Sequence, residues 1–310
     1  MPGEPLATTL GTAVRRRSRS SRTRLVFSVF KPRIAFEITL TAVAGAAITP
    51  GPALSLLEVL VLALAVFLSA GAAGAYNQVS EPASDRIMLR TRRRAFATGE
   101  LTPGPLWYAA IVGLTVFSVL LAAVVLNRMV AAQVLLGSLT YGYIYTAWLK
   151  RRTWMNIVIG GLAGSFAALA GSAAVDPQLP LAAWVFAAAL FFWTPPHFWS
   201  LAFYGKADYA RADIPMLPNF IGDRALAIVV LVHTVILVAL TLLPPLLETG
   251  WIYSLCAAGG GAYFIWTSIV FVRQPTRSNA MANFHGSLWQ LGLLLLGAIT
   301  SAVLSGHLAV

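Results

Sequence analysis

Residues 53–85 have the sequence ALSLLEVLVLALAVFLSAGAAGAYNQVSEPASD, in which a long apolar segment is followed directly by a polar one. The apolar part, 53–76, exceeds the roughly 20 residues that a helix needs to cross the hydrocarbon core of a bilayer. The polar part places Asn77, Glu81 and Asp85 four residues apart, which on a continuous helix would put their side chains on one face. The segment therefore predicts a membrane-spanning helix with a polar cluster at one end.

Apolar segments of this kind recur along the whole chain. Hydrophobic residues make up 58% of the sequence and charged residues 11%, and the mean hydropathy is +0.76, which excludes a soluble, disordered or fibrous protein. The single cysteine excludes an internal disulfide. We predict an all-α polytopic membrane protein, with a nine-helix domain over residues 31–310 and a basic tail over 1–30. The nine predicted spans are 34–50, 53–76, 105–126, 129–149, 154–175, 179–204, 224–243, 250–272 and 286–308.

The 22 Lys and Arg residues predict the orientation of these spans. If the N-terminus is cytoplasmic, all of them except Arg128 fall in cytoplasmic segments, as the positive-inside rule requires. Their excess then reflects topology rather than nucleic-acid binding, and the tail is expected to contact anionic lipid. We favour the cytoplasmic membrane of a bacterium, although a mitochondrial presequence has a similar composition. The long cytoplasmic connections, 77–104 and 205–223, are where function is expected.

Carboxylates at the edge of a bilayer need a compensating cation. Glu81 and Asp85 would be costly to bury without a partner, and Mg²⁺ accepts carboxylate oxygens together with water and phosphate oxygens. The arginines that follow, Arg90 and 92–94, carry guanidinium groups that suit phosphate. The pattern indicates a metal-bridged diphosphate site. A solvated loop that obeys the positive-inside rule would have the same spacing.

A second polar cluster follows the predicted span 179–204. It contains Lys206, Asp208, Arg211 and Asp213. These residues form either a second wall of the same site or ordinary surface ion pairs, such as Lys206 with Asp208.

Two features inside the predicted spans concern helix geometry. Pro195 and Pro196 lack backbone donors and are expected to kink or break their helix just before His197. A group of small residues is typical of closely packed membrane helices. These residues are Gly160, Gly161, Gly164, Gly171 and Ser172.

The motifs resemble those of the UbiA-type intramembrane prenyltransferases. The pattern Asn77-x3-Glu81-x3-Asp85-x2-Met88-x-Arg90-Thr91 is similar to the first aspartate-rich motif of that family. Two further stretches resemble motifs of the branch of the family that farnesylates heme. They are Trp193-Thr194-Pro195-Pro196-His197-Phe198-Trp199 and Lys206-x-Asp208-Tyr209-x2-Ala212-x-Ile214-Pro215-Met216-Leu217-Pro218. The segment Lys31-Pro32-Arg33 also fits this branch. One departure is Pro82-Ala83-Ser84, where the family has an acid-Arg-Asp run that begins at the fifth motif position. One carboxylate fewer is therefore available to a metal.

The resemblance implies the transfer of a farnesyl group from farnesyl diphosphate to a vinyl group of heme b, giving heme O. It also implies Mg²⁺ as cofactor and a central cavity with apolar and aromatic walls. The metal-binding and catalytic residues that it implies are Asn77, Glu81, Asp85 and Asp208. The residues that it implies for the diphosphate are Arg90, Lys206, Arg211 and Lys150. His197 would contact the heme; the alternative is a buried histidine that bonds a carbonyl freed by the prolines.

Two other functions are compatible with parts of the sequence. A related enzyme could use an aromatic quinone precursor as the prenyl acceptor. A transporter would also have many apolar helices, but its charges tend to lie at the membrane midplane. Both polar clusters here lie at one surface, which favours the enzyme. Heme A synthase or oxidase assembly factors are expected partners of the heme-modifying function.

Overall fold

The computed structural model describes residues 22–243, 246 and 248–308. Most of the predicted basic tail, residues 1–21, lies outside this part. The described residues contain helices and no strand, with one isolated bridge between Leu54 and Leu308. The predicted all-α class is therefore confirmed.

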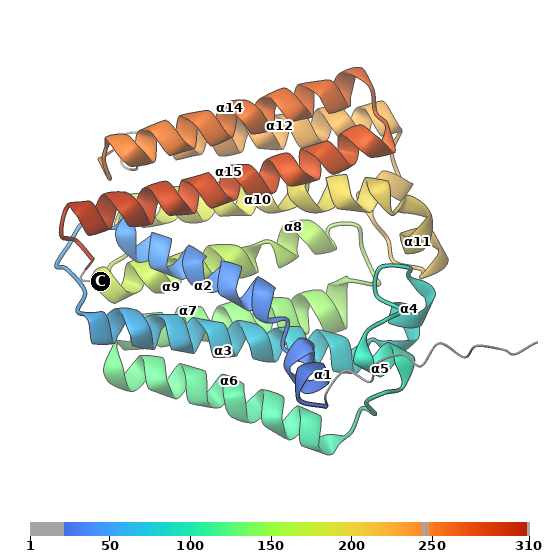
Figure 1. Ribbon diagram of the computed structural model, residues 1–310, viewed down its shortest axis with the longest axis horizontal. Coiled ribbons are helices and arrows are strands. Elements are labelled where there is room, and N and C mark those ends of the chain that lie inside the picture. Colours follow the sequence, from blue (N-terminus) through green and yellow to red (C-terminus); the bar gives the residue numbers. More distant parts are fainter. Residues whose placement is uncertain (1–21, 244–245, 247, 309–310) are drawn as a thin grey trace, which may run out of the picture.

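The helices follow one another closely along the chain (Figure 1). Their bounds are α1 Arg22–Val29, α2 Pro32–Ala47, α3 Leu56–Ser80, α4 Pro82–Ile87, α5 Ala95–Thr98, α6 Pro105–Val125, α7 Arg128–Leu139, the π-helix η1 Thr140–Leu149, α8 Asn156–Gly160, α9 Leu162–Val175, α10 Leu181–Tyr204, α11 Lys206–Arg211, the 3-10 turn η2 Leu217–Asn219, α12 Asp223–Thr241, α14 Trp251–Arg273 and α15 Arg277–Leu304.

The predicted spans overlap these helices. Seven helical segments of the described residues are long and apolar enough to cross a membrane on their own. The other two predicted spans differ: α2 has only 16 residues, and the span 129–149 is divided between α7 and η1. The number of nine crossings and the cytoplasmic side of the N-terminus stay predictions.

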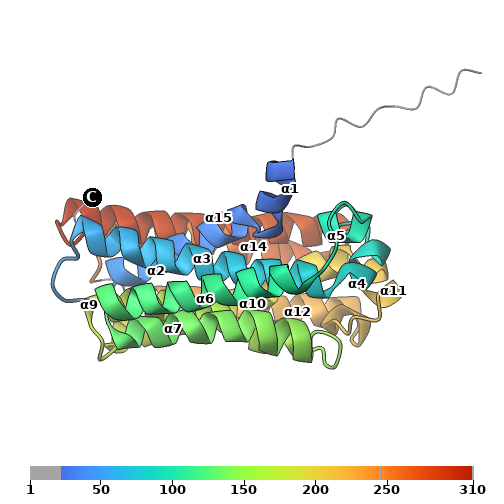
Figure 2. The ribbon, with the colours of Figure 1, turned by 90° about the horizontal axis from the view of Figure 1, so that it is seen from below.

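The long helices run side by side along the long axis of the molecule (Figure 1). Within the bundle, α10 packs against α12 and α15, and α2 packs against α3 and α9. The short helices α4, α5 and α11 gather at one end, the C-terminal end of α15 lies at the other, and α1 projects from the bundle (Figure 2). Large apolar side chains such as Leu106 and Val124 are 84% and 82% exposed, as suits a surface in contact with lipid. The polar connections therefore cap one end of an apolar bundle.

Small residues bring α2 and α9 into backbone contact. A Cβ atom on Gly171 would lie 1.6 Å from the carbonyl oxygen of Ala42, and one on Gly45 would lie 2.1 Å from that of Ala168. The Ser172 hydroxyl donates a hydrogen bond to the Gly45 carbonyl at 3.0 Å. Close packing is thus confirmed at Gly171 and Ser172. At Gly164, in contrast, an added Cβ would meet no atom of the described residues within 4 Å, and this glycine lines a cavity.

Of the two outcomes expected for α10, a kink or a break, the break does not occur. Pro195 and Pro196 both lie inside one continuous helix, Leu181–Tyr204. Helices α12 and α15 pack against α10, and such neighbours can hold a proline-containing membrane helix in place. As a result, His197 is presented from a continuous helix rather than from a loop.

Candidate active site

The first acidic motif lies at the junction of two helices. Helix α3 ends at Ser80, Glu81 has φ −122° and ψ 30°, and Pro82 is the first residue of α4. A proline lacks the N–H that would continue α3 but is well suited to begin a new helix. The prediction of one continuous helical face is therefore wrong for Asp85. Asn77 and Glu81 remain neighbours, because Asn77 Nδ2 donates to Glu81 Oε2 at 2.6 Å.

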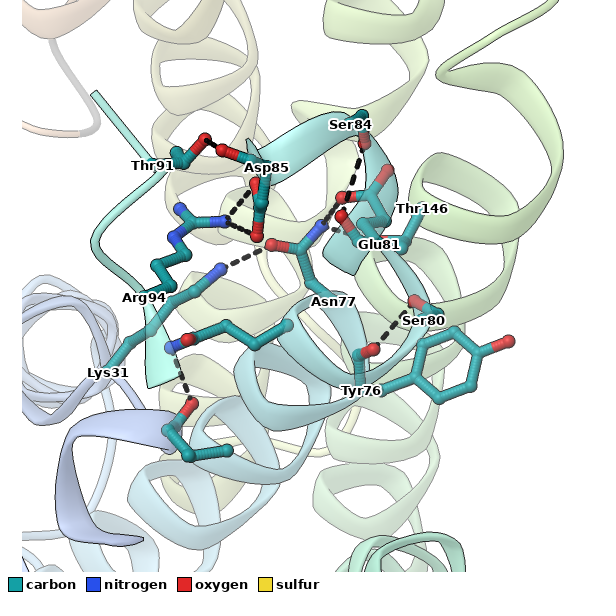
Figure 3. A network of polar contacts seen from close by, with 12 residues as sticks. Lys31, Tyr76, Asn77, Ser80, Glu81, Ser84, Asp85, Thr91, Arg94 and Thr146 are labelled. Atoms are coloured by element: carbon teal, nitrogen blue, oxygen red, sulfur yellow. Dashed lines mark hydrogen bonds and ion pairs between the residues drawn. The ribbon is translucent and has the colours of Figure 1, made fainter. Parts of the chain in front are cut away.

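Side-chain cations compensate both acids of the motif. Lys150 Nζ lies 2.5 Å from Glu81 Oε2, and Arg94 Nη1 donates to both oxygens of Asp85 at 2.9 Å (Figure 3 shows the Arg94 pair). Glu81 and Asp85 are 4% and 2% exposed. Their charges are thus neutralised inside the protein. Lys150, for which the family resemblance implies contact with diphosphate, is the partner of Glu81.

Lys31 extends this set of contacts toward a third helix. Its Nζ donates to Asn77 Oδ1 at 2.5 Å and to the Tyr141 hydroxyl at 2.9 Å (Figure 3 shows the bond to Asn77). Lys31 lies between α1 and α2. Its φ of 49° is in the left-handed region, which is unusual for residues other than glycine. We define the polar network by these members: Lys31, Asn77, Glu81, Asp85, Arg94, Tyr141 and Lys150.

Both lysines of the polar network are poorly hydrated. Burial and the nearby Arg94 guanidinium lower the pKa of Lys31 to about 7, against the opposing effect of Asp85 and Glu81. Burial also lowers the pKa of Lys150, although the adjacent Glu81 carboxylate acts in the other direction. An anionic ligand at this position would stabilise the charged form of both lysines.

The polar network has the ligands for a magnesium site that protein and substrate form together, rather than for a site made of protein ligands alone. Among the described residues, no three acidic, histidine or cysteine side chains gather as metal ligands. The Glu81 Oε1 atom, however, is buried and has no hydrogen-bond partner in the described part of the chain. Mg²⁺ commonly takes one or two carboxylates and completes its shell with water and phosphate oxygens. Asn77, Glu81 and Asp85 fit that role.

The second acidic loop meets the first through one hydrogen bond. The backbone N–H of Leu89 donates to Asp208 Oδ2 at 3.2 Å, and Asp208 also pairs with Arg211. The expected pair of Lys206 with Asp208 is wrong, because Lys206 pairs with Asp223 at 3.0 Å on an exposed surface. The two loops therefore touch through Leu89 and Asp208, while Lys206 and Arg211 pair with Asp223 and Asp208.

An apolar cavity of about 260 Å³ lies beside the polar network. Its walls come from α2, α3, α7, η1, α8, α9, α10 and α15. Tyr141 lines this cavity and accepts the hydrogen bond from Lys31, so it joins the cavity to the polar network. The aromatic and polar side chains of the wall include Tyr141, Trp193, His197, Phe198, Glu37 and Gln133.

His197 lines the same cavity and is held on three sides. Its ring stacks on Trp193 at a centroid distance of 4.3 Å and packs on Phe284 at 4.5 Å, and its Nδ1 lies 2.7 Å from Ser287 Oγ. The expected alternative, a bond to a carbonyl freed by the prolines, is not what the structure shows. A serine partner on α15 replaces it.

The Ser287 hydroxyl identifies the tautomer of His197. Its single hydrogen is donated to the Phe284 carbonyl at 2.6 Å, so His197 Nδ1 must carry a proton and donate to Ser287 Oγ. The other ring nitrogen, Nε2, then has a free lone pair and no hydrogen-bond partner among the described residues. This nitrogen is the one that could ligate a metal centre in the cavity.

Sequence reasoning did not identify the partners of several residues of this site. Ser287 had no predicted role, and Arg94 was expected to contact phosphate rather than Asp85. The observed partners of Arg94, Tyr141 and Ser287 depend on tertiary structure and leave no local pattern. Lys31 had a signal, because Lys31-Pro32-Arg33 fits the family motif, but its partners could not be inferred.

Comparisons with known proteins agree with this architecture. The family model described as the UbiA prenyltransferase family matches residues 38–301. Protoheme IX farnesyltransferase 2 of Paramagnetospirillum magneticum is 48% identical over 283 residues, which cover 91% of this chain and 98% of the relative.

Two solved structures share the fold at low sequence identity. One comes from work on digeranylgeranylglyceryl phosphate synthase and has a TM-score of 0.73 at 16% identity, covering 91% of this chain and 98% of that one. The other is a UbiA homolog from Archaeoglobus fulgidus bound to GPP and Mg²⁺, with a TM-score of 0.66 at 16% identity and coverage of 89% and 99%. Because the family model matches most of its length, the chain belongs to the UbiA prenyltransferase family and is an integral membrane protein.

Proposed function

We propose that this chain transfers the farnesyl group of farnesyl diphosphate to a vinyl group of heme b and releases diphosphate and heme O. The curated relative from Paramagnetospirillum magneticum is named for protoheme IX farnesyl transfer, and it is similar over nearly its whole length. One structural observation carries the proposal. One apolar cavity is lined both by Tyr141, which contacts the polar network, and by His197, whose Nδ1 is held by Ser287.

The polar network is suited to hold the diphosphate. Lys150 is a buried cation and Lys31 a half-buried one, and the loop 77–104 adds Arg90 and Arg94. Positive groups fixed at this position stabilise the negative charge that develops on the departing diphosphate as the allylic C–O bond breaks. Mg²⁺, held by Asn77, Glu81 and Asp85 with Asp208 nearby, would neutralise further charge on that leaving group. The leaving group then needs no proton.

The cavity protects the allylic cation until the acceptor reaches it. Its lining is mainly apolar, which excludes water, and it includes Tyr141 and Trp193, aromatic residues of the kind that attract a cation. The vinyl carbon then forms the new C–C bond. Water adds to the cation left on the acceptor and loses a proton to solvent, which gives the hydroxyethylfarnesyl side chain.

His197 is suited to orient the heme. Its ring is clamped by Trp193 and Phe284, and Ser287 fixes the tautomer that leaves Nε2 free. A histidine held in this way can ligate the iron and fix the plane of the porphyrin.

Product mass is the decisive measurement. Purified protein in detergent, supplied with heme b, farnesyl diphosphate and Mg²⁺, is expected to form heme O. Glu81→Gln and Asp85→Asn should lose this product, whereas Glu100→Gln, an exposed acid of the same loop, should retain it. Farnesylation of 4-hydroxybenzoate in place of heme would identify the quinone-precursor alternative. Unchanged turnover in both site variants would contradict the magnesium and diphosphate assignment.

We also propose that the enzyme resides in the cytoplasmic membrane of a bacterium. The relative from Paramagnetospirillum magneticum is bacterial, and the basic connections of this chain fit a cytoplasmic inner face. The mitochondrial inner membrane is the less favoured address. Heme A synthase or an oxidase assembly factor is the proposed recipient of the product, because heme O is apolar and remains in the membrane.

A further inference from the structure

A second groove lies between the C-terminal end of α10 and the N-terminal end of α15. Its lining combines an aromatic ring, an arginine and a histidine with small side chains. The residues are Tyr204, Arg277, Ser278, Met281, Ala282 and His285. The proposed reaction uses none of them.

The helix faces that form this groove also carry the His197 site. His197 and Tyr204 are seven residues apart on α10, which places them on nearly the same face and about 10.5 Å apart along the helix axis. Phe284 and Arg277 are likewise seven residues apart on α15. Phe284 packs on His197 at 4.5 Å, and the Arg277 guanidinium lies 4.8 Å from the centre of the Tyr204 ring. One seam therefore runs from the cavity to the membrane surface.

The outer end of the seam offers a positive charge. Arg277 uses its Nε to donate to the Tyr204 carbonyl at 3.0 Å, which orients the guanidinium. In the described part of the chain, Arg277 has no acidic partner. His285 is exposed beside it. An oriented guanidinium with unused N–H donors is well suited to a carboxylate.

We propose that this groove binds the carboxylates of the porphyrin acceptor while the iron faces His197. The inference rests on the proposed function. Heme b is a planar apolar ring with two propionates on one edge. Burying these carboxylates in the apolar cavity would be costly, whereas the groove keeps them at the wet surface beside Arg277. The ring then lies along the seam, and its vinyl groups point away from the surface into the cavity.

The test is a heme-binding titration that does not depend on turnover. Heme b and its dimethyl ester, which lacks the carboxylate charges, are titrated by absorbance into detergent-solubilised protein without farnesyl diphosphate. Arg277→Gln is expected to bind heme b about tenfold more weakly, the effect of losing one charge-assisted contact. The same variant should bind the dimethyl ester as the wild type does. In turnover, its KM for heme should rise and its KM for farnesyl diphosphate should not change.

Arg273→Gln is the matched control, because Arg273 is an exposed arginine of the same connection and does not line the groove. It should bind both hemes normally. The proposal is overturned if Arg277→Gln binds heme b like the wild type, or if it loses the ester equally. It is also overturned if the variant loses bound phosphatidylglycerol while its heme affinity is unchanged, which would identify a lipid site. If Arg277→Gln binds heme b more weakly and the dimethyl ester normally, but the wild type forms no heme O, the proposed function is rejected and the groove remains a heme-binding site.

Discussion

Lys31 connects the two parts of the candidate active site, since its ammonium group contacts Asn77 in the polar network and Tyr141 at the cavity wall. Lys31→Met should lower kcat/KM for farnesyl diphosphate by about a hundredfold, because a fixed cation aimed at a leaving group has an effect of this size. Turnover measured by heme O mass checks it. Arg33→Gln, an exposed cation two residues away, is the control and should stay within about twofold of wild type. Equal losses in both variants would indicate a general effect of surface charge.

The lowered pKa of Lys31 also predicts a pH dependence of stability in the ligand-free protein. Its pKa is about 7 in the folded protein, whereas the ordinary value of 10.5 holds after unfolding. Between these values the unfolded chain binds more protons, so the contribution of Lys31 to stability increases as pH rises from 7 toward 10. The melting temperature of the wild type should therefore improve relative to Lys31→Met between pH 7 and pH 9. A constant difference across this range would show that Lys31 stays charged in the folded protein.

Ser287 is predicted to act on the heme through His197. Ser287→Ala removes the acceptor of the Nδ1 proton, so the ring can change tautomer and the Nε2 lone pair is no longer fixed. We expect a heme affinity about tenfold lower and a shifted Soret band. Ser165→Ala, which removes a buried serine that bonds only the Ala187 carbonyl among the described residues, should leave the spectrum unchanged. An unaltered Soret band in Ser287→Ala would contradict ligation of the heme iron by His197.

The elements show what the sequence could and could not predict. Apolar length is a local property, and the predicted spans accordingly overlap the observed helices. Pro82 also has a local signature, yet the regular spacing of Asn77, Glu81 and Asp85 concealed the break between α3 and α4. In α10, in contrast, Pro195 and Pro196 do not end the helix, because neighbouring helices can hold a proline-containing helix in place.

The partners within the site depend on tertiary structure. Lys150 contacts Glu81 across 69 residues, and Lys31 contacts Tyr141 across 110. Tyr141 lies in η1, a π-helix, whose residues are not spaced as in the α-helix that the apolar run predicts. The residue types of the site were therefore predictable in large part, and the pairing between them was not.

The contact between α2 and α9 gives a prediction at the scale of elements. A Cβ on Gly171 would collide with the backbone of α2, so Gly171→Ala must force the two helices apart. Overpacking of this kind costs about 1–3 kcal/mol. Gly113→Ala is the control, because a Cβ there would meet no described atom within 4 Å. Melting in detergent should show a clear loss for Gly171→Ala and none for Gly113→Ala, and equal melting temperatures would contradict the close packing.

The topology of the whole molecule can be tested with its one cysteine removed. In a Cys256→Ser background, Gln178→Cys lies in a predicted outer loop and Phe220→Cys in a predicted cytoplasmic one. A membrane-impermeant maleimide added to intact cells should label the first and should label the second only after the membrane is opened. The reverse pattern would invert the predicted orientation, and labelling of both in intact cells would contradict the number of crossings.

The ion pairs of the polar network affect how the whole enzyme is loaded. In the ligand-free protein, Glu81 pairs with Lys150 and Asp85 pairs with Arg94, so each of these four groups already has a counterion. Lys31 contacts Asn77 and Tyr141 instead of an acid. A divalent ion that binds alone would displace one of these bases from its carboxylate and leave that base without a counterion. An anion that binds alone would leave an acid without one in the same way. A ligand that delivers both charges together lets every displaced group find a new partner. The prenyl donor and its metal are thus expected to enter as one complex, and free phosphate in the cytoplasm should compete poorly for the site.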